Sequence, residues 1–195
     1  MAPPSNTQAG SVSDLRKPSV YLTGHDQASV KAVIQEKRQP SWTVYDDKLM
    51  AFNVAYTTSE FPASLDNDVD IKKHDHLVGS NTLGLVNQNG TVCRIVDFAP
   101  EFDCMMHRTQ SLDYGVVLEG SIELVMDSGD TELMRRGDVA VQRGIMHAWR
   151  NPSDDEWARM LFVLQDCQKT RLGGQALEED LGRGIEGLPS SSNVV

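Results

Sequence analysis

The two stretches that decide the fold are His107-Arg-Thr-Gln-Ser-Leu-Asp113-Tyr-Gly-Val-Val-Leu-Glu-Gly120 and Gly137-Asp-Val-Ala-Val-Gln-Arg-Gly144-Ile-Met-His147-Ala-Trp-Arg-Asn151. Each combines short runs of β-branched and apolar residues with glycines that allow the chain to turn. Further turn signals lie between and after them, at Asp127-Ser-Gly-Asp130 and Asn151-Pro152. Short strands separated in this way are typical of an all-β sandwich or barrel.

The apolar runs between the turns predict strands that face each other as two sheets. In Ser121–Met126 apolar and polar residues alternate, which indicates one buried and one solvated face. In Ala158–Leu164 apolar residues lie on both faces, which indicates a strand that is covered on both sides. We expect these strands over residues 92–98, 114–126, 131–142 and 158–164.

The chain divides into a core and peripheral segments. The first 18 residues are rich in Pro, Ser, Asn and Gln, which predicts an arm that is disordered or packs on a neighbouring subunit. The expected division is an arm at 1–18, N-terminal strands and loops packing on the barrel at 19–89, the barrel core at 90–166, and a C-terminal helix and tail at 167–195.

Three peripheral segments carry more specific expectations. Ala28–Arg38 is either a short helix or a strand, because Val30, Val33 and Ile34 share a face in the helical case. Gly174–Arg183 is expected to form the C-terminal helix, since two leucines there lie four residues apart. His74-Asp-His76 has the spacing that places both imidazoles on one strand face. Because this stretch is highly charged, we expect both to be solvated.

The charge balance is acidic, with 18 Lys and Arg residues against 28 Asp and Glu residues and a net charge of −10. Nucleic acids and anionic membranes bind basic faces, so neither is an expected partner. We expect no signal peptide, because the N-terminus has neither a charged nor an apolar region, and no membrane span, because no apolar run is long enough. Three cysteines without metal-like spacing are typical of reduced thiols, which predicts a cytoplasmic protein. No Gly-x-Gly-x-x-Gly motif and no P-loop occur, so no nucleotide cofactor is expected.

The two opening stretches resemble the two sequence motifs of the cupin superfamily. In the first motif His107 and Gly120 match, Asp113 stands where cupins have Glu, and Thr109 stands where they have a second His. In the second motif the positions that match are Gly137, Gly144, His147 and Asn151; the motif is one residue short, and Gln142-Arg143 replaces its Pro. The resemblance implies an all-β, double-sheet jelly-roll (cupin) barrel with short peripheral helices and with both histidines on its inner face.

A narrower resemblance covers most of the chain. The same two stretches, together with Ala55-Tyr-Thr-Thr-Ser-Glu-Phe-Pro62, resemble the single-domain cupin proteins of fungal secondary-metabolite gene clusters. Those proteins are described as cupin oxidoreductases or decarboxylase-like proteins that assist polyketide tailoring. The resemblance implies a homodimeric enzyme with a small hydrophobic substrate.

His107, Asp113 and His147 are the candidate metal ligands. Two imidazoles and one carboxylate with open positions form the facial arrangement of non-haem iron enzymes. The missing second His of the first motif leaves three protein ligands at best, and Asp113 is shorter than Glu and can instead bond within a turn. The pattern leaves open Fe, Mn, Zn, Ni or no metal. Without metal, His107 or His147 is expected to act as a general base.

Several residues near the histidines are expected to bind the substrate. Trp149 follows His147 by two positions and shares its strand face. Four arginines could turn inward to bind an anionic or phenolic group, namely Arg94, Arg108, Arg143 and Arg150, and Arg143 is favoured. The expected substrate-binding set is Arg143, Trp149, Gln142, Met106 and Phe162.

The sequence leaves three functions open. The first is a metal-assisted oxidoreductase acting on a hydrophobic substrate that bears an enol, phenol or carboxylate. The second is a metal-independent dehydratase, isomerase or decarboxylase that uses His acid–base chemistry. The third is a non-catalytic binding protein. Metal content separates the first from the second, and turnover separates both from the third.

Overall fold

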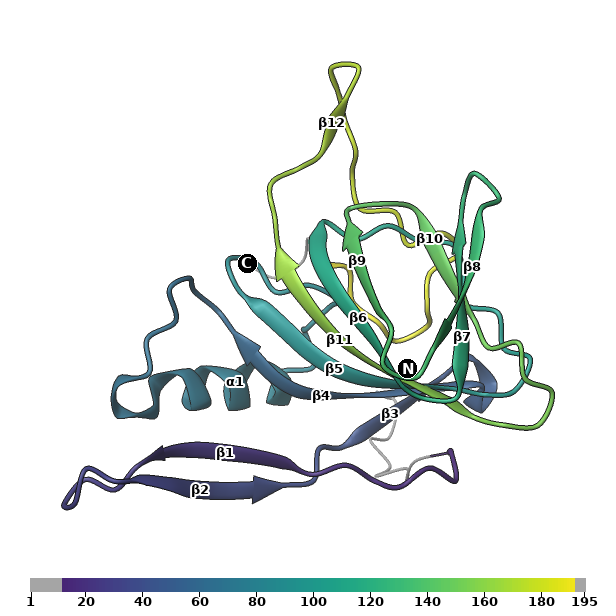
Figure 1. Cartoon of the computed structure of the whole chain (residues 1–195). Coiled ribbons are helices and arrows are strands. Elements are labelled where there is room, and N and C mark those ends of the chain that lie inside the picture. The colour runs from purple at the N-terminus through teal and green to yellow at the C-terminus, as the bar shows by residue number, and fades with distance from the viewer. Residues whose placement is uncertain (1–11, 192–195) are drawn as a thin grey trace, which may run out of the picture.

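The computed structural model describes residues 12–191, and two facing antiparallel sheets dominate it (Figure 1). The larger sheet has six strands in the order β3-β4-β5-β11-β6-β9, and the smaller has three in the order β10-β7-β8. This arrangement confirms the double-sheet jelly-roll barrel. The strands are β3 (Trp42–Tyr45), β4 (Met50–Thr58), β5 (Thr91–Phe98), β6 (Ser111–Glu119), β7 (Ser121–Met126), β8 (Thr131–Arg135), β9 (Val139–Arg143), β10 (His147–Arg150) and β11 (Ala158–Asp166).

The strand predictions hold, with two interruptions that the glycines explain. The expected strands 92–98 and 158–164 correspond to β5 and β11. The expected strand 114–126 is β6 followed by β7, which part at Gly120, and 131–142 is β8 followed by β9, which part near Gly137. Both glycines have positive φ, +69° and +94°, a conformation that strains other residues.

The barrel core lies between the two sheets. Met160, Phe162 and Leu164 of β11 are buried on the inner face, where alternate strand residues point together. Burying each such side chain stabilises the fold by about 1.5–3 kcal/mol. The opposite face of β11 is also covered, because Leu161 packs against a smaller cluster made of Trp42, Ala51 and Ile95. This confirms that the strand is covered on both sides.

Asn151, the last residue of the second motif, has a structural role. Its side chain is 1% exposed. Its Nδ2 donates to the carbonyls of Phe98, Ala99 and Glu156 at 3.2, 3.0 and 2.8 Å. These bonds join the end of β10 to the end of β5 and to the turn before β11.

The N-terminal part forms a hairpin of β1 (Val20–His25) and β2 (Ala32–Arg38), so the strand alternative is the correct one for residues 32–38 of the expected segment 28–38. The arm prediction needs correction for residues 12–18. Ser13 is buried and donates a hydrogen bond to Asp97, which also accepts two bonds from Arg159. This segment therefore packs on the barrel of its own chain. Residues 1–11 of the expected arm lie outside the described residues.

The segment 69–79 forms the helix α1 (Val69–Gly79), so the expected surface strand there is wrong. The helix lies along the outer side of β4 (Figure 1). His74 is buried, with Nδ1 3.0 Å from the hydroxyl of Thr57 and its ring 4.7 Å from that of Tyr56. His76 is exposed. A two-residue spacing places side chains on different helix faces, which explains why only His76 is solvated. Two short 3-10 turns, η1 (Asp46–Lys48) and η2 (Asp66–Asp68), complete the peripheral elements.

The expected C-terminal helix over 174–183 is wrong. The chain instead forms a small hairpin of β12 (Arg171–Leu172) and β13 (Gln175–Ala176) and then continues without helix. Gly174 and Gly182 have positive φ, which is incompatible with a right-handed helix at those points. Beyond the hairpin the backbone of Asp180 exchanges two hydrogen bonds with that of Arg108, at 2.7 and 2.9 Å. Figure 1 shows this yellow segment crossing the opening of the barrel.

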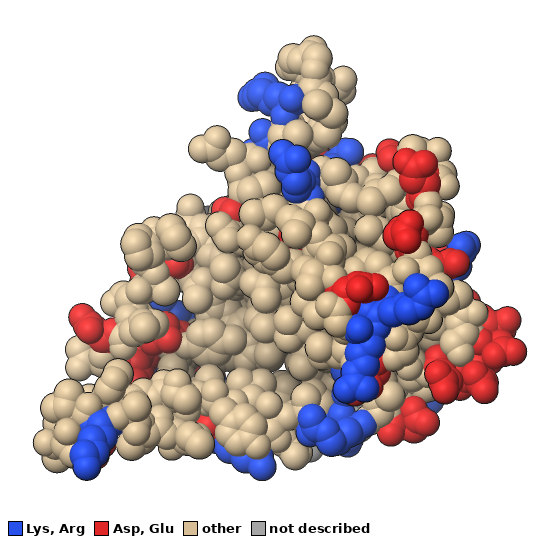
Figure 2. Space-filling model, in the orientation of Figure 1, with Lys and Arg blue, Asp and Glu red and all other residues tan. Residues whose placement is uncertain are grey.

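Charged side chains are unevenly spread on the face seen in Figure 2. Its area over β5 and β11 is largely uncharged, and most Lys, Arg, Asp and Glu side chains lie around it. Within residues 12–191, no helix is both long and apolar enough to cross a membrane.

Candidate functional site

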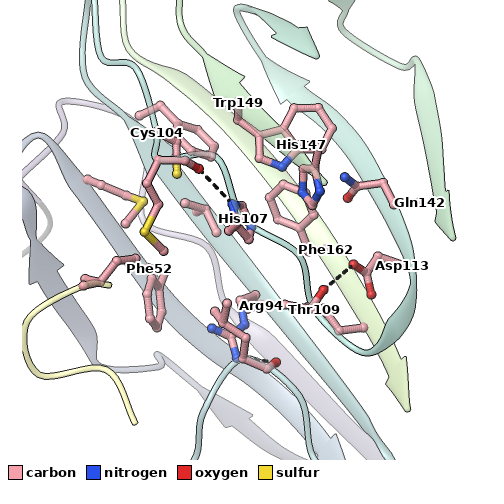
Figure 3. Close-up of a pocket in the computed structure, with 17 residues that line it drawn as sticks. Phe52, Arg94, Cys104, His107, Thr109, Asp113, Gln142, His147, Trp149 and Phe162 are labelled. Carbon is pink, nitrogen blue, oxygen red and sulfur yellow. Dashed lines mark hydrogen bonds between the residues drawn. The ribbon is translucent and has the colours of Figure 1, made fainter. Parts of the chain in front are cut away.

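A cavity lies between the two sheets, and both histidines of the sequence motifs line it (Figure 3). Its space measures about 580 Å³, including the part that is open to solvent. Small-molecule sites are mostly apolar with few polar groups. The same holds here, because apolar side chains of β4, β5 and β11 form much of the wall. The polar lining residues are Arg94, His107, Thr109, Asp113, Gln142 and His147.

His107 and His147 lie side by side because their backbones pair. The N–H of His107 donates to the carbonyl of His147 at 2.8 Å, and the N–H of His147 donates back at 2.9 Å. The side chains of such a pair project from the same face. Their ring centroids are 4.4 Å apart. The two imidazoles therefore act at one place in the cavity.

Hydrogen bonds fix the tautomer of both histidines. The Nδ1 of His107 lies 2.9 Å from the carbonyl of Met105, and the Nδ1 of His147 lies 3.1 Å from that of Ile145. Because a carbonyl oxygen can only accept, each Nδ1 carries a proton. Each Nε2 consequently has a free lone pair, which can accept a proton or bind a metal ion.

Burial lowers the pKa of both imidazoles. His147 is 2% exposed, and burial together with the neighbouring His107 lowers its pKa to about 3. Burial likewise lowers the pKa of His107. Both rings are therefore neutral at pH 7, and a proton on one ring opposes protonation of the other.

Asp113 also faces the cavity, but it is held by hydroxyl groups. The hydroxyl of Thr109 donates to its Oδ2 at 3.3 Å, and Ser111 in turn donates to Thr109 at 2.8 Å. Its Oδ1 is buried without a hydrogen-bond partner in the described part of the chain, and the same is true of Nε2 of Gln142, its cross-strand neighbour. Burial raises the pKa of Asp113 to about 6. Thr109, which replaces the second cupin His, thus positions this carboxyl group.

The side chains present do not fit the expected metal site. Among residues 12–191, no three His, Cys, Asp or Glu side chains lie close enough together to hold one ion. His107 and His147 supply two adjacent nitrogen donors, whereas the carboxyl group of Asp113 bonds to Thr109. Two imidazoles alone fall short of the two-His, one-carboxylate set.

The expected substrate-binding residues divide into those inside the cavity and those outside it. Trp149, Gln142 and Phe162 line it, with the Trp149 ring centroid 5.4 Å from that of Phe162. Arg143 does not, because strand residues alternate and Gln142 takes the inward position on β9. Met106 is also absent from the lining. The structure thus places three of the five expected residues in the cavity wall and leaves Arg143 and Met106 outside it.

Among residues 12–191, Arg94 is the arginine that lines the cavity, whereas the sequence favoured Arg143. The alternation of residues along β5 indicates that Arg94 faces the cavity. Arg94 lies in phase with Val96 and Phe98, so a β5 strand whose apolar residues face inward also turns Arg94 inward.

Comparisons with known proteins agree with this geometry. The family model "Cupin domain" matches residues 94–164. "Phomopsin biosynthesis cluster protein D" of Diaporthe leptostromiformis is 39% identical to this chain, over 92% of this chain and 95% of its own length. The chain belongs to the cupin-domain proteins of fungal secondary-metabolite clusters. Another relative of this cupin is "Cupin-domain-containing oxidoreductase virC" of Hypocrea virens, at 37% identity over 83% of this chain and 85% of its own.

Among solved structures, a cupin-2 domain protein from Rhodospirillum rubrum aligns with 79% of this cupin and 78% of its own chain. The TM-score is 0.44 at 12% sequence identity. The family resemblance inferred from the two motifs is thus confirmed by the sequence relatives.

Proposed function

We propose that this cupin is an enzyme that modifies a small, largely apolar intermediate of secondary metabolism, with His107 and His147 as its catalytic pair. One observation carries the proposal. Two neutral imidazoles, 4.4 Å apart, each with Nδ1 bonded to a carbonyl, line the same mostly apolar cavity with their Nε2 lone pairs free. A general base requires such a nitrogen beside its substrate.

The reaction class that this pair supports best is proton transfer. In the proposal, Nε2 of one imidazole removes a proton from a carbon next to a carbonyl group, and the resulting imidazolium returns it at a second position. Return to carbon gives isomerisation, and return to a leaving hydroxyl gives water and a dehydrated product. The repulsion between the rings keeps the second imidazole neutral while the first holds the proton.

The proposal is tested with the natural intermediate. A producing strain without the gene for this protein is expected to accumulate one compound, which is detected by mass spectrometry. Purified wild-type protein should convert that compound into the next intermediate of the pathway. If the protein binds the compound and leaves it unchanged over hours, it is a binding protein and the proposed enzymatic function is wrong.

Metal-assisted oxidoreduction is the second candidate. The names of relatives favour it, among them "Cupin-domain-containing oxidoreductase fogC" of Aspergillus ruber. The candidate ions are Fe, Mn, Zn and Ni, for which His107 and His147 offer two nitrogen ligands. An enol, phenol or carboxylate on the substrate fits this candidate as well as the first.

We expect a cytoplasmic homodimer that binds neither nucleic acid nor membranes. Sedimentation equilibrium tests the dimer, because the subunit mass is 21.6 kDa and a dimer has twice that mass.

A further inference from the structure

The cavity contains a buried arginine whose hydrogen-bonding capacity is only partly used. Arg94 of β5 is 2% exposed and lines the cavity. Its Nη2 donates to the carbonyls of Gly84 and Leu85, both at 2.9 Å. Its Nε and Nη1 are buried and have no hydrogen-bond partner among residues 12–191. A guanidinium carries five N–H groups, so those that Nη2 does not provide still lack an acceptor.

The charge of Arg94 is also uncompensated. No carboxylate in the described part of the chain lies within the 4.0 Å of an ion pair with it. Asp113, on β6, attracts it only from a distance, since β11 separates their strands. The ring of Phe52 lies 4.8 Å from its Cζ and covers one face of the guanidinium. A buried cation in this state is costly, and an anion beside it offsets that cost.

The other buried arginine of the same sheet shows the contrast. Arg159 of β11 faces the opposite side of the sheet and uses all three nitrogens. Nε and Nη2 donate to the two carboxylate oxygens of Asp97 at 2.5 and 2.7 Å, and Nη1 donates to the carbonyl of Arg16 at 2.6 Å. A structural arginine in this fold is therefore fully paired. Arg94 has the donors of such a site without the acid, and it is one of the residues that line the cavity.

We propose that Arg94 binds a carboxylate of the substrate, so that the substrate is a small, largely apolar carboxylic acid. This inference rests on the proposed function, because it names the group by which the intermediate is held. Figure 3 places Arg94 on one side of the cavity and the two histidines on another, with the ring of Phe162 next to the histidines. A carboxylate at Arg94 leaves the apolar body of the molecule against Phe52 and Phe162. The opposite end of the molecule then reaches His107 and His147.

Binding measurements test this inference without requiring turnover. Isothermal titration compares three acids with their neutral alcohols, namely benzoate with benzyl alcohol, cinnamate with cinnamyl alcohol, and 2-naphthoate with 2-naphthylmethanol. In each pair the apolar part is the same and only the charge differs. We expect wild-type protein to bind at least one acid about 10-fold or more tightly than its alcohol, because a charge-assisted bond to a desolvated guanidinium is strong.

Substitutions assign the preference to one residue. Arg94→Met is expected to weaken binding of that acid by about 10-fold or more and to change binding of its alcohol by less than about 3-fold. Arg94→Lys keeps the charge and should retain part of the preference. Arg143→Met, at the exposed arginine of β9, is the matched control and should leave both affinities unchanged.

Two results overturn the inference. In the first, no acid of the panel binds more tightly than its alcohol to wild-type protein, a comparison that does not depend on the folding of any variant. In the second, Arg94→Met, folded by circular dichroism, keeps the preference. The proposed function fails separately. If acids bind through Arg94 but the accumulated intermediate is not converted, the site binds acids without catalysis.

Discussion

Asp113 is the residue whose ionisation should couple folding most visibly to pH. Its pKa is about 6 in the folded protein, against 3.8 for the unperturbed group, because burial disfavours the carboxylate. The folded state therefore binds more protons than the unfolded state between about pH 4 and pH 6. Stability must then fall as pH rises through this window. A shift of about two units corresponds to about 3 kcal/mol.

Asp113→Asn removes this titration and isolates the effect. We expect the free energy of unfolding of the variant minus that of wild type to increase by about 2–3 kcal/mol between pH 4 and pH 7, because only wild type loses stability in this window. Urea unfolding at several pH values measures the difference. Asp154→Asn, at an exposed carboxylate, is the control and should show no such trend. A pH-independent difference for Asp113→Asn would mean that its carboxyl group titrates normally.

At the scale of single residues, the sequence identified the two histidines of the site but did not decide which arginine faces the cavity. His107 and His147 occur in motifs whose glycines set their position, so their meeting in the cavity could be predicted. Arg94 was one of four candidate arginines, because a charged residue in a strand usually faces solvent. Only the alternation of residues along β5 shows that Arg94 faces inward. The lack of a third ligand could not be predicted, since the bond between Asp113 and Thr109 is a matter of tertiary distance.

Among the structural elements, the pair of β5 and β11 depends on one buried ion pair. The carboxylate of Asp97 has no exposed surface, and the Arg159 side chain is 6% exposed. We expect Asp97→Ala to lower the free energy of unfolding by about 3–5 kcal/mol, because it leaves a buried guanidinium without its counter-ion. Urea unfolding monitored by circular dichroism measures this loss. A loss below about 1 kcal/mol would show that water or another acid replaces Asp97.

The N-terminal segment should contribute to stability through the same carboxylate. Ser13→Ala removes the hydroxyl that bonds to Asp97, and we expect a loss of about 1 kcal/mol. Asp14→Ala changes the exposed neighbour and should alter stability by no more than about 0.5 kcal/mol. Equal effects of the two substitutions would indicate that the segment does not dock on the barrel in solution.

Elements of the barrel were predictable from sequence, and peripheral elements were not. Strands such as β5 and β11 bury one or both faces, so their apolar pattern has a clear period. The helix α1 is largely polar and buries only His74 among its residues, which leaves little helical pattern to detect. Around 174–183 the leucine spacing favoured a helix, but the glycines on either side and the pairing of Asp180 with Arg108 determined the outcome.

For the whole molecule, metal content decides between the two candidate reactions. Since two imidazoles are the donors that come together, we expect protein purified without a chelating tag to contain well under one equivalent of Fe, Mn, Zn or Ni by elemental analysis. Dialysis against EDTA should leave turnover of the accumulated intermediate unchanged. Loss of turnover on dialysis, with recovery when one ion is added back, would establish the oxidoreductase candidate in place of proton transfer.

The central claim is that His107 and His147 carry the chemistry, and turnover by alanine variants tests it most directly. With the accumulated intermediate as substrate, His107→Ala and His147→Ala should each lower kcat/KM by about 100-fold or more. Each should cost only about 0–1.5 kcal/mol of stability, the contribution of a single hydrogen bond. His76→Ala, at an exposed histidine of α1, should behave as wild type. Wild-type turnover by the double variant His107→Ala, His147→Ala would contradict the claim and place the chemistry elsewhere.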